Sequence, residues 1–268
     1  MGVLWGVGDM QFIKDFLERE KLRQGVVIKE FPNGTKYIHE RDLQTKRVVH
    51  KCFKPLDSSA IDKLQSDVNK AKGASYIFPN WYRDFFKSTN GLNLFFSSIY
   101  FDGEQTPMIQ HPIYGWTEAG IGGYSNNPIE RENWMAPSNL RYTRLDIFDL
   151  NAQNRWLRIG AYGQDGSHIN WDFKKNKIVV MYSLPAVTPT KELRKFTEQD
   201  YEQRIFAEWS DFETFFLSET ERLAKIFELY PNVTHIETCS KLKKKFPNIV
   251  DSLCYKKTLP KGHKDYFE

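Results

Sequence analysis

Short turns between strand-like runs are the sequence feature that most constrains the fold of this chain. Residues 26–31 and 35–39 alternate between apolar and polar side chains on either side of a Pro-Asn-Gly turn at 32–34. Asn-Gly between alternating runs is the strongest short-range signal for a β-hairpin. Residues 47–53 add a third run, which Pro55 ends. The sequence therefore predicts a small β-meander near the N-terminus.

A second group of strand-like runs lies beyond the middle of the chain. Residues 156–162 and 168–173 flank a Gly-Gln-Asp-Gly turn at 163–166, and residues 177–182 follow across a short turn at 174–176. Apolar runs of this length with turn residues between them are typical of strands that pair antiparallel. The sequence therefore predicts a second antiparallel meander.

Apolar residues at helical spacing mark the regions that flank these strands. They predict helices over residues 10–24, 57–72, 80–89, 197–209 and from 210 to the region of Phe227. Pro79 suits the start of the third helix, which should bury Trp81 and Phe85 together with Tyr82 or Phe86. Gly91 stands where a left-handed residue is needed after that helix.

Capping residues mark the starts of several of these helices. Asp57 or Ser58 can cap the second helix, and Thr197 or Asp200 can begin the fourth. Residues 210–213, Ser-Asp-Phe-Glu, form a capping box for the fifth helix. The buried face of the fifth helix is expected to comprise Phe212, Phe215, Phe216, Leu223 and Phe227.

The stretch between the third helix and the second meander changes character. Residues 92–101 read as one apolar strand, but periodicity disappears over residues 104–139, within a variable region that extends to residue 144. A loop of this length in a compact domain is usually functional. Its aromatic and arginine residues are of the types that most often anchor protein interfaces. They are Tyr114, Trp116, Tyr124, Arg131, Trp134, Arg141, Tyr142 and Arg144. We expect these residues either to bind a partner or to pack against the sheet as part of the core.

The order of elements predicts an α+β fold in which helices flank an antiparallel β-sheet meander. We expect three parts. Residues 1–56 form an N-terminal extension of a helix and a β-hairpin meander, residues 57–228 form the main domain, and residues 229–268 form a helical, basic C-terminal tail.

Composition places the chain among folded proteins, because 40% of its 268 residues are hydrophobic and 27% are charged. No run approaches the roughly 20 apolar residues that span a bilayer. The first residues lack the basic and apolar regions of a secretory signal. Cys52, Cys239 and Cys254 are far apart and form neither a zinc spacing nor a disulfide framework. We therefore expect a cytoplasmic protein.

Positive charge is concentrated at the C-terminal end. Residues 240–268 hold eight lysines and three acidic residues, a balance of +5 within a net charge of +4, so the rest of the chain sums to −1. A lysine cluster can contact nucleic-acid phosphates or remain a solvated surface. Only Phe246 and Tyr255 are close to the Lys241–Lys245 run as stacking platforms, so nucleic acid is a weaker expectation than a protein partner.

Motifs that carry catalytic chemistry are missing from the sequence. Residues 120–123, Gly-Ile-Gly-Gly, lack the Lys-Ser/Thr of a phosphate-binding loop. The six histidines show no metal-ligand spacing. Asp165 and Asp172 could hold a cation, although a turn aspartate more often caps its own backbone. We therefore expect no catalytic residues, no metal, no cofactor and no small-molecule substrate.

Three segments follow one another in an order that resembles a known family. Residues 78–91 combine Phe-Pro, a short helix with an aromatic pair, and Asn-Gly before a strand. Residues 156–172 have an Ile-Gly strand, a Gly/Asp turn and a closing Trp-Asp, and residues 209–217 read Trp-Ser-Asp-Phe-Glu-Thr-Phe-Phe-Leu. Together they resemble the SUKH superfamily of Smi/Knr-type proteins over residues 57–228.

This resemblance implies an α+β domain without catalysis. Many bacterial members are immunity proteins that bind and neutralise a polymorphic toxin, often a nuclease, and fungal members regulate cell-wall synthesis through protein contacts. We therefore expect a non-enzymatic binding protein whose partner is a protein toxin. Two alternatives stay open: an intracellular scaffold or regulator that acts through protein contacts, and a nucleic-acid-associated protein that uses the lysine-rich tail.

Overall fold

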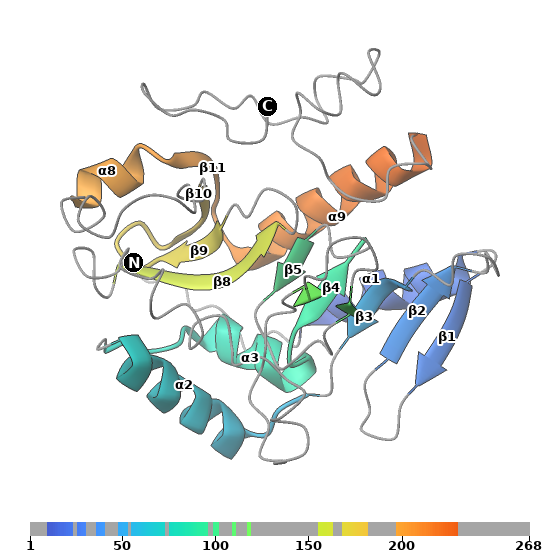
Figure 1. Ribbon diagram of the computed structural model, residues 1–268, viewed down its shortest axis with the longest axis horizontal. Helices are drawn as coiled ribbons and strands as arrows, with labels where there is room; N and C mark the ends of the chain where they lie inside the picture. The colour runs from blue at the N-terminus through green and yellow to red at the C-terminus, as the bar shows by residue number, and fades with distance from the viewer. Residues whose placement is uncertain are drawn as a thin grey trace.

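A computed structural model describes the chain over most of its helices and strands (Figure 1). The described residues are 10–23, 26–30, 36–40, 48–52, 55–72, 75–95, 99–101, 109–110, 117–118, 155–162, 168–181 and 197–229. Within them the chain combines helices with an antiparallel sheet, which confirms the predicted α+β class. The expected helical tail after residue 229 lies outside the described residues.

One antiparallel sheet runs through the described part of the chain. Its nine strands lie in the order in which they occur in the sequence. They are β1 (Val26–Glu30), β2 (Lys36–Glu40), β3 (Val48–Cys52), β4 (Leu92–Leu94), β5 (Ile99–Phe101), β8 (Trp156–Tyr162), β9 (His168–Asp172), β10 (Lys177–Met181) and β11 (Ile205–Trp209). Two short strands, β6 (Ile109–Gln110) and β7 (Thr117–Glu118), pair separately with each other. The fold is therefore a meander, as the short turns predicted.

The sheet continues across the expected boundary at residue 56. That boundary lies between β3 and the next helix, yet β3 pairs with β4 through Lys51↔Asn93 and Cys52↔Leu92. The two predicted meanders are thus joined edge to edge within one sheet. The division into residues 1–56, 57–228 and 229–268 stays a prediction.

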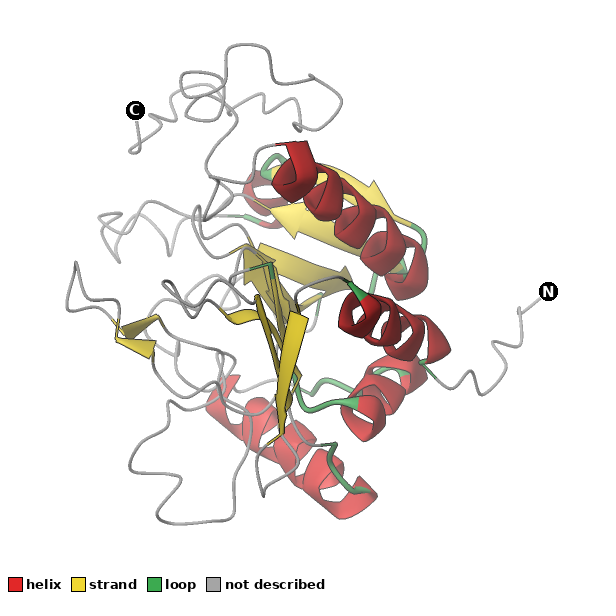
Figure 2. Cartoon of the chain, turned by 90° about the vertical axis from the view of Figure 1, so that its right-hand side faces the viewer, coloured by secondary structure: helices red, strands yellow, loops and turns green. Residues whose placement is uncertain are grey.

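The described helices are α1 (Gln11–Leu22), α2 (Ser58–Lys72), α3 (Asn80–Ser88), α8 (Glu198–Glu202) and α9 (Phe212–Leu229). Figure 2 shows helices along one side of the sheet. Alternation along β8 explains this arrangement, because Leu157 and Ile159 join the large core that α1, α3 and α9 also enter. Trp156 points to the opposite face, where it packs with Val179 and Tyr201. The sheet is therefore buried on both faces at this end.

The segment 92–101 is a hairpin, and the prediction of one continuous strand was wrong. β4 and β5 pair antiparallel, with Leu94 opposite Ile99. The chain reverses at Phe95, which has a left-handed φ of 52°. This conformation is uncommon for a residue other than glycine, so sequence pattern gave no sign of the turn.

The fourth predicted helix, residues 197–209, begins where expected but is half helix and half strand, so its predicted extent was wrong. Thr197 caps α8 in a capping box with Asp200, but the helix ends at Glu202. Residues 205–209 then form β11, which pairs with β10 through Ile178↔Trp209 and Val180↔Ala207. The backbone of β10 needs hydrogen-bond partners on the side away from β9. This long-range pairing determines that residues 205–209 form a strand.

Two helix ends differ in detail from the predictions. Asp211, not Ser210, caps α9, because its Oδ1 accepts from the backbone N–H of Thr214 at 2.7 Å. α3 ends at Ser88, and Thr89 adopts an extended conformation. Gly91 has the expected positive φ, 113°, but lies two residues beyond the Thr89 C-cap. The other starts agree with expectation: Asp57 accepts from Ala60 N–H at 2.8 Å, and α3 follows Pro79.

Candidate functional site

The three family-like segments come together at one tryptophan in the core. Trp81 of α3 stacks on Phe212 of α9, with ring centroids 4.9 Å apart and an interplanar angle of 17°. Trp81 also meets Trp171 of β9 edge to face at 5.2 Å. Each of these residues belongs to a different segment. The segments therefore build one packing centre, although long stretches of sequence separate them.

Most of the first segment is buried structure. Tyr82, Phe85 and Phe86 are almost completely buried, while Trp81 is partly buried against the same core. Thr89 is fully buried, and its hydroxyl donates to the carbonyl of Gly91 at 2.7 Å. The aromatic side chains of residues 78–91 thus support the fold, whereas Asn80 and Lys87 are exposed. The predicted faces of α3 and α9 are correct, except that the side chain of Phe227 lies outside the described residues.

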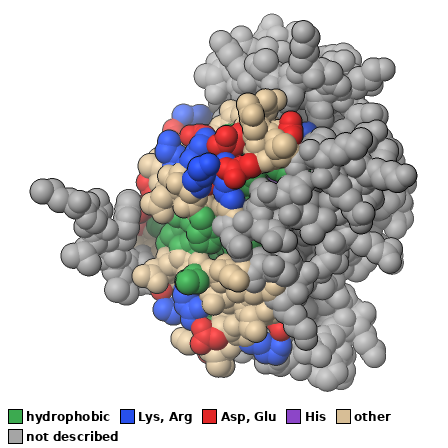
Figure 3. All heavy atoms as spheres, turned by 90° about the vertical axis from the view of Figure 1, so that its left-hand side faces the viewer, with side chains coloured by type: hydrophobic (Ala, Val, Ile, Leu, Met, Phe, Trp, Pro, Cys, Tyr) green, Lys and Arg blue, Asp and Glu red, His purple; other side chains and the backbone are tan. Residues whose placement is uncertain are grey.

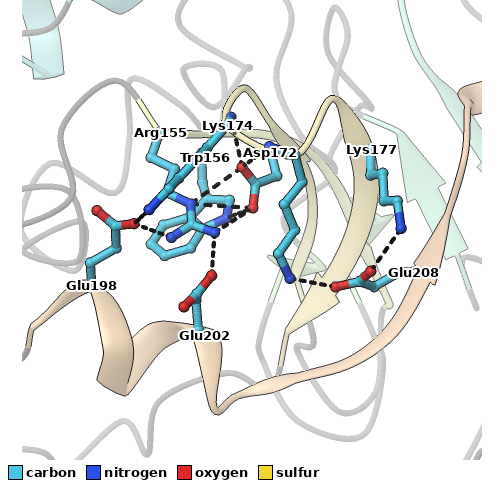
Figure 4. A network of polar contacts seen from close by, with 9 residues as sticks. Arg155, Trp156, Asp172, Lys174, Lys177, Glu198, Glu202 and Glu208 are labelled. Carbon is cyan, nitrogen blue, oxygen red and sulfur yellow. Dashed lines mark hydrogen bonds and ion pairs between the residues drawn. The ribbon is translucent and has the colours of Figure 1, made fainter.

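A buried arginine at the start of β8 is the centre of the main polar cluster. Arg155 has a side chain that is only 5% exposed, and it binds Asp172 at the end of β9 through Nη2 at 2.9 Å. Its guanidinium also pairs with Glu198 and Glu202 of α8. Figure 4 shows the guanidinium between Asp172 on one side and these two glutamates on the other. The cluster therefore fixes α8 to the β8–β9 pair.

Asp172 has its hydrogen-bonding capacity filled. Its side chain is fully buried, and Oδ2 accepts from Trp156 Nε1 at 2.9 Å as well as from Arg155. Oδ1 accepts from the backbone N–H groups of Lys174 and Lys175 at 2.9 and 3.0 Å. Asp172 thus caps its own turn, the commoner of the two roles weighed for it. Asp165, the other residue considered for a cation, lies outside the described residues.

Electrostatics agree with a structural role for this cluster. Burial opposes the charge of Asp172, yet the hydrogen bonds from Arg155, Lys175 and Trp156 hold its pKa below the usual value. Burial likewise opposes the charge of Arg155, but its carboxylate partners raise its pKa. Both groups are therefore fixed in their charged forms. A carboxylate whose acceptor sites are all occupied is poorly placed to take a proton from a substrate.

The outer side of this end of the molecule carries mixed charges around an apolar area (Figure 3). Lys174 pairs with Glu198 at 2.8 Å on the α8 side, and Arg83 pairs with Asp62 on the α2 side. In the segment between α2 and α3, Ile77 is 77% exposed, whereas Tyr76 and Phe78 on either side of it are buried. An apolar centre with a polar rim is common at protein interfaces.

All eight residues that the sequence predicts to bind a partner lie outside the described residues. Their role stays a prediction. The Arg155 cluster was not predicted from the sequence. A buried salt bridge leaves little signal in one sequence, because Arg155 precedes a strand in a stretch where a surface charge is equally plausible.

Other kinds of site were sought among the described residues. In those parts of the chain, no three His, Cys, Asp or Glu side chains lie close enough together to hold a metal ion. The helices there are too short or too polar to cross a membrane. Comparison of the chain with models of protein families, with curated proteins and with solved structures gave no match.

Proposed function

We propose that this protein is a non-enzymatic binding protein, and specifically an immunity protein that binds and neutralises a bacterial toxin. The observation that supports this most is the convergence of Trp81, Trp171 and Phe212. These residues come from three segments that resemble the SUKH superfamily. A shared packing centre is what such segments require if they belong to one domain of that kind.

The described polar clusters support a binding role over a catalytic one. Asp172 and Arg155 satisfy each other inside the protein, and Glu198 and Glu208 at the surface pair with Lys174 and Lys175 of the same domain. Partner recognition is therefore assigned to residues 104–144, whose aromatic and arginine side chains suit an interface. The exposed Ile77 is a second surface that a partner could cover.

We expect a gene beside this one to encode a toxin domain, and co-expression with that domain is the test. We expect cells to survive the toxin only when this chain is present, and a complex of the two proteins to co-purify. Absence of both protection and complex with a neighbouring toxin would remove the proposal. Capture of an unrelated endogenous protein, without protection, would instead favour the scaffold or regulator.

The lysine-rich segment 240–268 favours a second candidate, a nucleic-acid-associated function. Such binding must weaken steeply with salt, because lysines release counterions from the phosphates that they contact. It must also disappear when residues 240–268 are removed. Binding that is absent, or that does not depend on salt, would end this second candidate.

A further inference from the structure

His50 of β3 is a buried histidine whose two ring nitrogens both bind protein groups. Its side chain has no exposed surface. The ring packs against Phe16 of α1 and Phe95 of the β4–β5 turn, with centroid distances of 5.2 and 4.7 Å and nearly perpendicular planes, and these two phenylalanines also lie 6.1 Å from each other. His50 therefore connects three elements that come from separate parts of the chain.

The hydrogen bonds of His50 define its protonation state. Nδ1 lies 3.2 Å from the backbone nitrogen of Phe95, which can only donate, so Nδ1 must accept and carries no proton. Nε2 lies 3.0 Å from Oε2 of Glu20, and a carboxylate accepts, so Nε2 carries the proton. The ring is thus the neutral Nε2–H tautomer. This arrangement also supports the left-handed backbone at Phe95, whose φ is 52°.

We propose that His50 is a protonation-sensitive clamp that holds α1 and the β4–β5 turn against β3, and that mild acid opens it. A proton added to Nδ1 would point at the N–H of Phe95 and break that hydrogen bond. It would also place a full positive charge among phenylalanine rings, away from water. The folded protein therefore keeps this histidine neutral, while the opened form takes up a proton.

The charged groups around His50 are consistent with this balance. Glu20 favours a charged imidazole, but its carboxylate already has Arg23 at 3.6 Å. Burial opposes the charge of Glu20, but the hydrogen bond from His50 and the positive charge that His50 carries when protonated, followed by Arg23 and Arg19, lower its pKa. Arg19 also acts on Glu221 of α9. Arg23, the C-cap residue of α1, therefore shares the Glu20 carboxylate with His50, while the Phe95 N–H opposes a proton on Nδ1.

Opening of the clamp would uncover an aromatic surface. Phe12 and Phe16 of α1 contact Phe216 of α9, with centroid distances of 5.3 and 5.5 Å. Phe12 also meets Phe212 at 6.0 Å. Release of α1 separates these rings and exposes the helix face of the core. The clamp thus couples one protonation event to exposure of apolar surface.

Hydrogen exchange of the α1 amides tests the proposal when protection is corrected for the pH dependence of intrinsic exchange. Free histidine titrates at about 6.5, so we expect constant protection from pH 7.5 to about 6.5. Below that, the opening constant should rise by up to about tenfold per pH unit, the slope for uptake of one proton. Glu20, whose pKa is lowered, responds only at more acidic pH.

Two variants that cannot titrate provide the comparison. His50→Asn places an amide near the Nδ1 position and His50→Gln places one near the Nε2 position, and both should abolish the response between pH 7.5 and 5. His168→Gln, a change on β9, should leave the response intact. Constant or rising α1 protection in the unmodified chain on acidification would overturn the proposal, as would an undiminished response in both His50 variants.

Nitrogen NMR of the histidine rings is an independent measurement if the variants do not fold. We expect His50 in the closed, unmodified protein to show only the Nε2–H tautomer at pH 6, while exposed histidines are partly charged. A charged His50 ring in the closed protein at that pH would contradict the clamp.

Discussion

Trp81 and Phe212 lie nearly parallel in the core, with ring centroids 4.9 Å apart, and so join α3 to the first turn of α9. Phe85 completes the contact by meeting Phe212 edge to face at 5.6 Å. Stacked and edge-to-face ring pairs stabilise beyond the area that they bury. This junction is therefore where a substitution should weaken the whole domain.

Phe212→Ala should lower the free energy of unfolding by about 3–5 kcal/mol, because it removes a large buried ring and leaves a cavity. Urea denaturation followed by tryptophan fluorescence measures this change. Leu217→Ala is the matched control on the same helix, since Leu217 is 44% exposed, and it should cost no more than about 0.5 kcal/mol. Equal losses of unfolding free energy in both variants would show that the contact between Trp81 and Phe212 adds no more stability than an exposed position on α9.

Asp172→Ala should be strongly destabilising, because it leaves the buried guanidinium of Arg155 without its main partner. Breaking a buried ion pair from one side costs about 3–5 kcal/mol. Glu198→Gln is the matched control, since this partner is 40% exposed and a partly exposed pair contributes at most about 1 kcal/mol. Chemical denaturation at neutral pH distinguishes the two losses, and a small effect of Asp172→Ala would contradict a central role for the cluster.

Stability should fall below about pH 4 as Asp172 becomes protonated. Its pKa is lowered in the folded state by Arg155, Lys175 and Trp156 despite burial. The unfolded chain therefore takes up the proton first as pH falls, so the contribution is present above the unfolded value and is lost on acidification. Denaturation between pH 7 and 3 should show a shallower acid decline for Asp172→Asn than for the unmodified chain. An unchanged slope would assign the acid sensitivity to other groups.

Asp211→Ala should cost about 1 kcal/mol, because Asp211 accepts from the backbone N–H of Thr214 at the start of α9. Ser210→Ala is the comparison, because the Ser210 hydroxyl donates to Asp211 without capping the backbone itself. Ser210→Ala should lower the free energy of unfolding by a clearly smaller amount than Asp211→Ala. Equal costs would restore Ser210 as the capping residue that the sequence pattern suggested.

The turn between β9 and β10 should tolerate glycine better than alanine. Asn176 is exposed and has a left-handed φ of 53°. Asn176→Ala should be less stable than Asn176→Gly by about 1 kcal/mol, since a Cβ atom is disfavoured in this conformation. Thermal unfolding compares the two variants, and a more stable alanine variant would contradict this backbone requirement.

Much of the sheet could be predicted from local pattern, because the turns near Gly34 and Asn176 lie between runs of alternating or apolar residues. Local pattern failed where long-range contacts decide. Phe95 adopts a left-handed conformation in which its backbone N–H donates to His50, a residue distant in sequence. Residues 205–209 form a strand because they pair with the otherwise unpaired edge of β10. The Arg155–Asp172 pair was missed for the same reason, because the sequence around either residue does not indicate which distant residue it pairs with.

The proposed neutralisation of a toxin by binding is tested most directly by titrating a purified toxin domain, encoded by a neighbouring gene, with the full chain. We predict that toxin activity falls to background as the chain is added and that binding is saturable. Alanine at Tyr114, Trp116 and Trp134 together should abolish inhibition while the α1–α9 core stays folded. Full toxin activity at saturating concentrations of the folded, unmodified chain would contradict the claim.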